Sequence, residues 1–233
     1  MRQTPVDFDD YADIYEGLLN SCIGLFGEKD DYFHLHKLTC LKRWIPGIES
    51  KATILDFGCG IGKLATLTAH AFPQSTVYGY DISSKCIEIA RKKWGHIENL
   101  FFSNELPSKR YFDLIIAANV FHHIKPPDHA GRLLQLKEMI KPGRNIVIFE
   151  HNPLNPLTRY IVKTCLFDRE AELISLRQFI GLARKSGLRI SLKRYTVFFP
   201  KFLSPFRRFE PFLGFLPLGA QYMLLLRSDE QDE

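Results

Sequence analysis

The chain has 233 residues, 45% of them hydrophobic, and a formal net charge of +5 at pH 7. This length and composition exclude a disordered protein and favour one main domain with a large buried core. The five cysteines form no C-x-x-C pair, and we find no signal-peptide pattern or long uncharged apolar run. We therefore expect a soluble, cytoplasmic protein with reduced thiols.

Residues 1–50 are predicted to form a helical lead that packs on the main domain at residues 51–228. Within the lead, apolar side chains recur at helical spacing in two stripes. The stripes consist of Tyr11, Ile14, Tyr15, Leu18 and Leu19, and of Tyr32, Leu35, Leu38 and Leu41.

Residues 52–71 predict a strand, a tight turn and a helix. A β-favouring run leads into Gly58, Gly60 and Gly62, and apolar residues at helical spacing follow. Glycine permits positive φ and lets a ligand lie on the backbone at a helix N-terminus, so this turn indicates a nucleotide site. A P-loop is excluded, because Leu64 stands where a P-loop has Ser or Thr.

Two cofactors fit this turn. Gly60-x-Gly62-x-x-Ala65 matches the dinucleotide fingerprint, and Asp81 lies at the right distance for a ribose hydroxyl. Residues 56–62, however, closely resemble the first motif of the class I methyltransferases that use S-adenosylmethionine. That family places an acidic residue before the glycines, as at Asp56, where a dinucleotide fingerprint prefers an apolar residue. The resemblance implies cofactor contacts from Asp56, Phe57, Gly58, Cys59, Gly60 and Gly62, and lid contacts from Tyr11 and Tyr15.

The next predicted strand, at residues 76–81, ends in Asp81, and Ser83 or Ser84 would cap the helix that follows. Asp81 could accept hydrogen bonds from both ribose hydroxyls, with Ile82 beside it, although an ordinary capping role is the alternative. A third strand is predicted at residues 100–102. Family members commonly place a polar or acidic side chain after it, near the adenine amino group. The usual Asp is missing here, which leaves Ser103, Asn104 and Glu105 as candidates.

Residues 112–118 are almost all apolar, as is typical of a strand buried on both faces of a parallel sheet. The run from Asn119 to residue 124 resembles the fourth methyltransferase motif, which implies that Asn119 and Val120 border the methionine end of the cofactor. His122 and His123 are acid–base candidates, because histidine titrates nearest neutrality, and a packing role for one of them is the alternative. We expect no metal, since adjacent histidines diverge and no second group of ligand residues stands at fixed spacing.

A helix at residues 128–140, stopped by Lys141-Pro142-Gly143, and a strand at residues 145–150 complete the pattern of alternating strands and helices. We predict an α/β fold with a doubly wound, mostly parallel seven-stranded sheet of Rossmann-like methyltransferase type. Its carboxyl rim would bring together Asp56, Asp81, Asn119 and Glu150.

Two Asn-Pro dipeptides, at residues 152–153 and 155–156, predict a shaped loop at the rim and preclude a regular helix there. In this loop His151 is an alternative catalytic base and Arg159 an anion contact. Asx turns that only stabilise the loop are an equal alternative.

A helix at residues 170–186, a strand at 188–195 and a last strand at 222–226 are predicted next, with a frayed tail at 229–233. The insertion at about 196–219 is rich in Phe and Pro, and we expect most of its phenylalanines in the core. The alternative is an amphiphilic surface that docks on a membrane or grips a lipid-like acceptor. Residues 184–208 support that alternative, since they hold eight basic residues and no acidic one: Arg184, Lys185, Arg189, Lys193, Arg194, Lys201, Arg207 and Arg208.

The resemblance covers about residues 50–227. It implies methyl transfer from S-adenosylmethionine to a small-molecule or lipid-like acceptor, in a subgroup associated with bacterial polysaccharide and secondary metabolism. The alternatives are an NAD(P)-dependent oxidoreductase and a non-catalytic cofactor-binding scaffold. Nucleic-acid modification is disfavoured, because no RNA-binding module accompanies the basic segment. The acceptor atom and the oligomeric state stay open.

Overall fold

A computed structural model describes residues 30–45, 51–106, 112–165, 168 and 170–228, together with Gly17. The predicted lid contacts of Tyr11 and Tyr15 and the predicted tail at 229–233 lie outside these residues. Among the described helices, none combines the length and the hydrophobicity needed to cross a bilayer.

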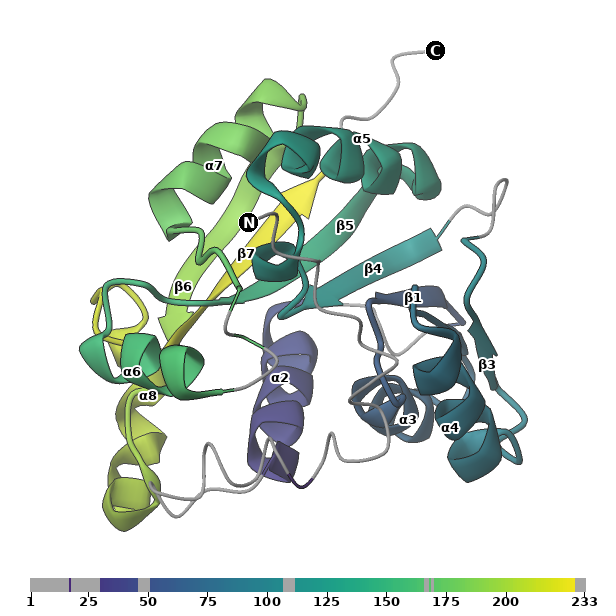
Figure 1. Cartoon of the computed structure of the whole chain (residues 1–233), viewed down its shortest axis with the longest axis horizontal. Helices are drawn as coiled ribbons and strands as arrows, with labels where there is room; N and C mark the ends of the chain where they lie inside the picture. Colours follow the sequence, from purple (N-terminus) through teal and green to yellow (C-terminus); the bar gives the residue numbers. More distant parts are fainter. Residues whose placement is uncertain are drawn as a thin grey trace, which may run out of the picture.

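A seven-stranded sheet with the order β3-β2-β1-β4-β5-β7-β6 forms the centre of the molecule (Figure 1). Strands β1 to β5 pair in parallel, whereas β7 runs antiparallel to both β5 and β6. This confirms the predicted doubly wound, mostly parallel sheet. The strands are β1 Thr53–Phe57, β2 Thr76–Tyr80, β3 Leu100–Ser103, β4 Phe112–Ala118, β5 Ile140–His151, β6 Arg189–Thr196 and β7 Gln221–Arg227.

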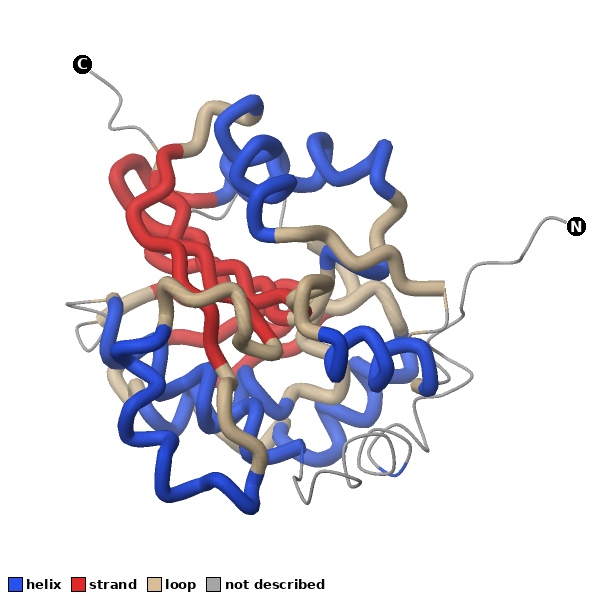
Figure 2. Tube along the Cα trace, turned by 90° about the vertical axis from the view of Figure 1, so that its left-hand side faces the viewer, coloured by secondary structure: helices blue, strands red, loops and turns tan. Residues whose placement is uncertain are grey.

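Helices cover both faces of the sheet, as the view along its edge shows (Figure 2). One hydrophobic core joins the sheet to α2, α3 and α4, and a second joins its other face to α5 and α7. The helices are α2 Asp30–Trp44, α3 Lys63–Ala71, α4 Ser84–Trp94, α5 His129–Met139, α6 Pro156–Thr164, α7 Leu176–Lys185 and α8 Glu210–Leu213, with 3₁₀ segments η2 Phe121–His123, η3 Pro126–Asp128 and η4 Lys201–Phe209.

The strand order creates a switch point between β1 and β4. From β1 the chain moves outward through β2 and β3, and it then returns to the other side of β1 to form β4 and β5. The loops after β1 and β4 therefore leave the sheet in opposite directions and open a crevice between them, which is where open α/β sheets bind ligands.

Three sequence-based boundaries are wrong. A helix, α6, begins directly at Pro156, because Asn155 caps it through the Thr158 amide and proline is compatible with the first helical position. The next helix, α7, begins only at Leu176, where Ser175 and Gln178 form a capping box. Strand β5 starts at Ile140, so the predicted stop at 141–143 lies inside the strand.

The insertion between β6 and β7 packs on α2, where the Arg207 guanidinium lies 3.8 Å from the Tyr32 ring centroid. The expectation that most of its phenylalanines are buried is wrong. Prolines break the segment into short helices that cannot enclose all of its side chains. A buried carboxylate there, Glu210, accepts hydrogen bonds from the amides of Phe198 and Phe199. The exposed side chains are Phe202, Phe206, Phe209, Phe212 and Phe215.

Candidate active site

The turn between β1 and α3 is built from glycines with positive φ. Gly58, Gly60 and Gly62 have φ of 75°, 52° and 85°. A Cβ atom on Gly58 would lie 2.4 Å from Val120, and one on Gly62 would lie 2.6 Å from Phe102, so both positions require glycine for packing. A Cβ atom on Gly60 would meet nothing within 4 Å. The Gly60 backbone therefore faces open space in which a ligand can approach it.

Asp81 is held in place at the end of β2 by the turn itself. Its Oδ2 accepts a hydrogen bond from the Gly60 amide at 2.7 Å, and its Oδ1 accepts one from the Ser83 amide at 3.0 Å. A carboxylate offers about four lone-pair sites, so these two hydrogen bonds are compatible with the predicted contact with ribose hydroxyls.

Asp56 is a buried carboxyl at the end of β1, with a relative exposure of 1%. Burial and the neighbouring Asp81 carboxylate raise its pKa to about 7. Among the described residues, neither its Oδ2 nor the Oδ1 of Asn119 has a hydrogen-bond partner. Because buried polar atoms are normally paired, these two acceptors indicate that a donor on a ligand belongs between β1 and β4.

A cavity of about 420 Å³ lies at the switch point and joins these groups to a cluster of histidines. Its wall includes α2 on one side, through Phe33, His34 and Lys37, and α6 on another, through Ile161 and Val162. The predicted residues that line it are Asp56, Phe57, Gly58, Cys59, Gly60, Asp81, Ile82, Asn119, Val120, His122, His123 and His151.

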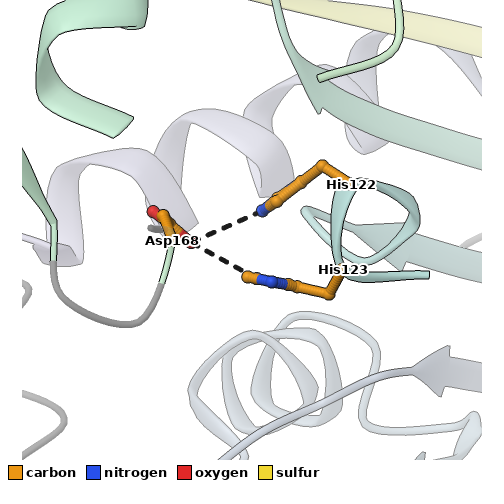
Figure 3. Close-up of side chains that lie close together, drawn as sticks. All are labelled: His122, His123 and Asp168. Atoms are coloured by element: carbon orange, nitrogen blue, oxygen red, sulfur yellow. Dashed lines mark ion pairs between the residues drawn. The ribbon is translucent and has the colours of Figure 1, made fainter. Parts of the chain in front are cut away.

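The histidine cluster is organised around His122, which is buried between two carboxylates. Its Nδ1 lies 2.6 Å from Oε2 of Glu150, and its Nε2 lies 3.7 Å from Oδ1 of Asp168. The same Asp168 oxygen lies 3.3 Å from Nε2 of His123, so the two imidazoles point to one carboxylate (Figure 3). The backbone holds this arrangement in place, since the Glu172 amide donates to the carbonyl of His122 at 2.8 Å.

The pKa values in the cluster diverge. Burial alone would lower the pKa of His122, but the Glu150 and Asp168 carboxylates raise it to about 10. Burial and the charge on His122 lower the pKa of His123 to about 3 and that of His151 to about 4. The His122 charge also holds the pKa values of Glu150 and Asp168 below their usual range, although burial opposes this.

Several predicted contacts lie away from the cavity. Gly62 does not line it and instead precedes α3. The Ser103 hydroxyl bonds the backbone of Glu105, and the Asn104 amide bonds Ser84, so none of the three adenine candidates, Ser103, Asn104 or Glu105, reaches the cavity lining. Arg159 is exposed and outside the lining, and the Asn152 and Asn155 side chains tie their loop to residues 217–219.

The lining residues that sequence reasoning missed include the charged residues Lys37 and Asp168. Lys37 is 2% exposed and comes from the middle of α2, and its positive charge lowers the pKa of Asp56. Asp168 comes from a segment without a motif. The available signal for Lys37 was its position one helical turn before the buried Leu41, because residues i and i+4 share a helix face.

The fold and the site together define a class I S-adenosylmethionine-dependent methyltransferase architecture. The model of a family described as "methyltransferase domain" matches residues 32–192, which is more than half of the chain, and the chain belongs to this family.

Relatives with assigned names include two bacterial methyltransferases. A malonyl-[acyl-carrier protein] O-methyltransferase of Halalkalibacterium halodurans is 31% identical over 113 residues, which are 45% of this chain and 41% of the relative. A demethylmenaquinone methyltransferase of Chlorobaculum tepidum is 30% identical over 161 residues, which are 68% of this chain and 63% of the relative. The matches thus span less than two thirds of either relative.

Solved structures share the whole fold. A methyltransferase from Thermotoga maritima superimposes with a TM-score of 0.67 at 19% identity, over 95% of this chain and 98% of that one. Magnesium protoporphyrin IX methyltransferase from Synechocystis, with bound S-adenosylhomocysteine, gives a TM-score of 0.67 at 16% identity, over 95% and 98% of the two chains.

The residues of the cavity fit S-adenosylmethionine. Its α-ammonium group is a donor for the unpartnered oxygens of Asp56 and Asn119, and its cationic charge matches the carboxylates of Asp56 and Asp81. The open face of Gly60 leaves space for the ligand at the turn.

Proposed function

We propose that the protein transfers a methyl group from S-adenosylmethionine to a small or lipid-like acceptor bound at the histidine end of the cavity. One observation carries the proposal: a single cavity connects the glycine turn to His122, His123 and His151. A donor held at the turn and an acceptor held at the histidines would meet within this cavity, whose lining also includes Asn119 and Val120.

Methyl transfer is an in-line displacement at a sulfonium carbon. Because the leaving group is already good, alignment of the nucleophile at roughly 3 Å provides much of the rate, and a base is needed only when the acceptor must lose a proton. His151 is placed for that role, since its ring lines the cavity and makes no hydrogen bond or ion pair with the described residues. His122 and His123 are instead engaged by Glu150 and Asp168.

The exposed phenylalanines support a lipid-like acceptor. Phe202, Phe212 and Phe215 are 76%, 72% and 77% exposed, and Lys201 and Arg208 are exposed on the same insertion. Aromatic side chains beside basic ones suit the surface of an anionic membrane, where lipid-like acceptors dissolve. The quinone named for the C. tepidum relative is an acceptor of this kind.

The test is an assay of labelled methyl transfer from S-adenosylmethionine to two sets of acceptors, water-soluble hydroxy acids and quinol-type lipids in vesicles. We expect methyl transfer to the quinol-type lipids. The variant His151→Ala should lower the rate of this transfer at least 100-fold without changing the affinity for the cofactor. Transfer to neither set by protein that binds the cofactor would contradict the proposal.

A further inference from the structure

Three metal-ligand atoms converge at the histidine end of the cavity. One ring nitrogen each of His122 and His123 and a carboxylate oxygen of Asp168 all lie within 4.8 Å of one another. Both histidines come from η2, whereas Asp168 comes from the segment after α6, so the fold and not the sequence spacing creates the group (Figure 3). The sequence argument against a metal held that adjacent histidines diverge and that no second group of ligand residues stands at fixed spacing. In the structure, however, both imidazoles approach the same Asp168 oxygen.

We propose that His122, His123 and Asp168 form a binding site for a divalent transition-metal ion, with zinc as the ion that the donors suit best. Two imidazole nitrogens and one carboxylate are a donor set that zinc takes readily, whereas magnesium prefers oxygen ligands alone.

The distances support this site. In a tetrahedral site with metal–ligand bonds of about 2.0–2.1 Å, neighbouring ligand atoms lie about 3.3–3.4 Å apart. The Asp168 oxygen lies 3.3 Å from Nε2 of His123 and 3.7 Å from Nε2 of His122. Small shifts of these side chains would therefore place an ion among all three atoms.

Glu150 supplies the outer support that metal-binding histidines usually have. It lies 2.6 Å from Nδ1 of His122 and keeps the proton on that nitrogen, so a metal would bind at Nε2 in place of the proton that Nε2 holds in the metal-free protein. Its other oxygen accepts hydrogen bonds from the amides of Val120 and Phe121 at 2.9 and 2.6 Å. The orientation of the His122 ring is thus set from the side opposite to the proposed ion.

Three protein ligands would leave a fourth position on the cavity side, which is the arrangement of catalytic rather than structural zinc sites. The role of the ion rests on the proposed function: it would hold the oxygen or nitrogen of the acceptor close to the donor methyl group. Binding of the ion itself is independent of that function, so the two can be tested separately.

The experiment uses full-length protein without an affinity tag, treated with a chelator and then titrated with Zn²⁺ in competition with a chromogenic chelator. We expect each protein molecule to bind one Zn²⁺ ion tightly. A Co²⁺-loaded sample should show the visible absorption of a four- or five-coordinate site with nitrogen and oxygen ligands. Asp168→Asn and His123→Gln should each weaken Zn²⁺ binding at least 100-fold. The matched controls His96→Gln and Asp128→Asn, both at exposed positions, should bind as the parent protein does.

Each metal-free sample is also titrated with S-adenosylhomocysteine. Binding of this ligand shows that the variant is folded and tests the cofactor site separately from the metal site. Absence of a stoichiometric Zn²⁺ site in the parent protein would overturn the inference even if the variants failed to fold. Equal Zn²⁺ affinity in parent protein, Asp168→Asn and His123→Gln would overturn it as well. Loss of cofactor binding with an intact zinc site would count against the proposed function alone.

Discussion

Glu150 and His122 form a fully buried pair, with Oε2 and Nδ1 2.6 Å apart and both side chains 1% exposed. The pair joins the end of β5 to the loop after β4, and through Asp168 it reaches the segment after α6. One carboxylate therefore holds together three segments that border the cavity.

Replacing Glu150 by Gln should lower the free energy of unfolding by about 3 kcal/mol, because it leaves the buried His122 with one carboxylate fewer. Chemical denaturation measures this change. Glu138→Gln, an exposed position on α5, is the control and should change stability by less than about 0.5 kcal/mol. Equal effects of the two substitutions would contradict the structural role of the pair.

Asp56 should make cofactor binding depend on pH. Its pKa is raised from 3.8 to about 7, so without ligand it is protonated at pH 6 and mostly ionised at pH 8. Since an ammonium group prefers the ionised form, affinity for S-adenosylhomocysteine should rise about tenfold between pH 6 and pH 8. Calorimetry at several pH values checks this, and Asp56→Asn should remove the dependence.

The stability of the ligand-free protein should change with pH in the opposite direction to its affinity for the cofactor. A carboxyl whose pKa is raised on folding stabilises the fold while it is protonated, so the ligand-free protein should lose stability as pH rises from about 4 to 7. Lys37→Met should move the midpoint of both effects to higher pH, because the Lys37 charge favours ionised Asp56. A midpoint that Lys37→Met leaves unchanged would show that the two groups do not interact.

Gly60→Val should abolish detectable cofactor binding while the protein stays folded. The new side chain would enter the cavity, where it meets no protein atom within 4 Å of its Cβ, and the φ of +52° adds strain of about 1–3 kcal/mol. Gly187→Val is the control, because Gly187 also has a positive φ, of +67°, but lies outside the cavity lining. Retained binding in Gly60→Val would exclude the turn from the cofactor site.

The exposed aromatic side chains of the insertion should mediate membrane binding. Phe202→Ser combined with Phe215→Ser should lower co-sedimentation with phosphatidylglycerol vesicles at least tenfold and leave cofactor affinity unchanged. Leu35→Ser, at an exposed position on α2, serves as the control. Equal sedimentation of parent protein and double variant would refute a membrane role for these phenylalanines.

The fold and most residues of the glycine turn that line the cavity could be predicted from the sequence, because both depend on local signals. The glycines that follow Asp56 indicate a turn with positive φ, and the apolar run at 112–118 is typical of a buried strand. The contacts at the histidine end of the cavity could not be predicted in the same way. Asp168 is brought to His123 by the path of the chain after α6, which leaves no periodic pattern, and Lys37 is a charged residue in a position where charge is rare.

The errors also have physical causes. Proline at residue 156 indicates a loop when only helix interiors are considered, yet at the first helical position it lacks only a hydrogen bond that no helix makes there. Phenylalanine side chains are usually buried in folded proteins, so the sequence predicts burial. In the insertion, however, prolines shorten the helices, and five of the phenylalanine side chains stay exposed.

The most direct measurement is a calorimetric titration of the purified protein with S-adenosylhomocysteine and, separately, with NADH. We predict binding of S-adenosylhomocysteine in the micromolar range and no heat with NADH, because the carboxyl of Asp56 and the open face of Gly60 suit a ligand with an ammonium group. Binding of NADH without S-adenosylhomocysteine, or of neither ligand, would contradict the account.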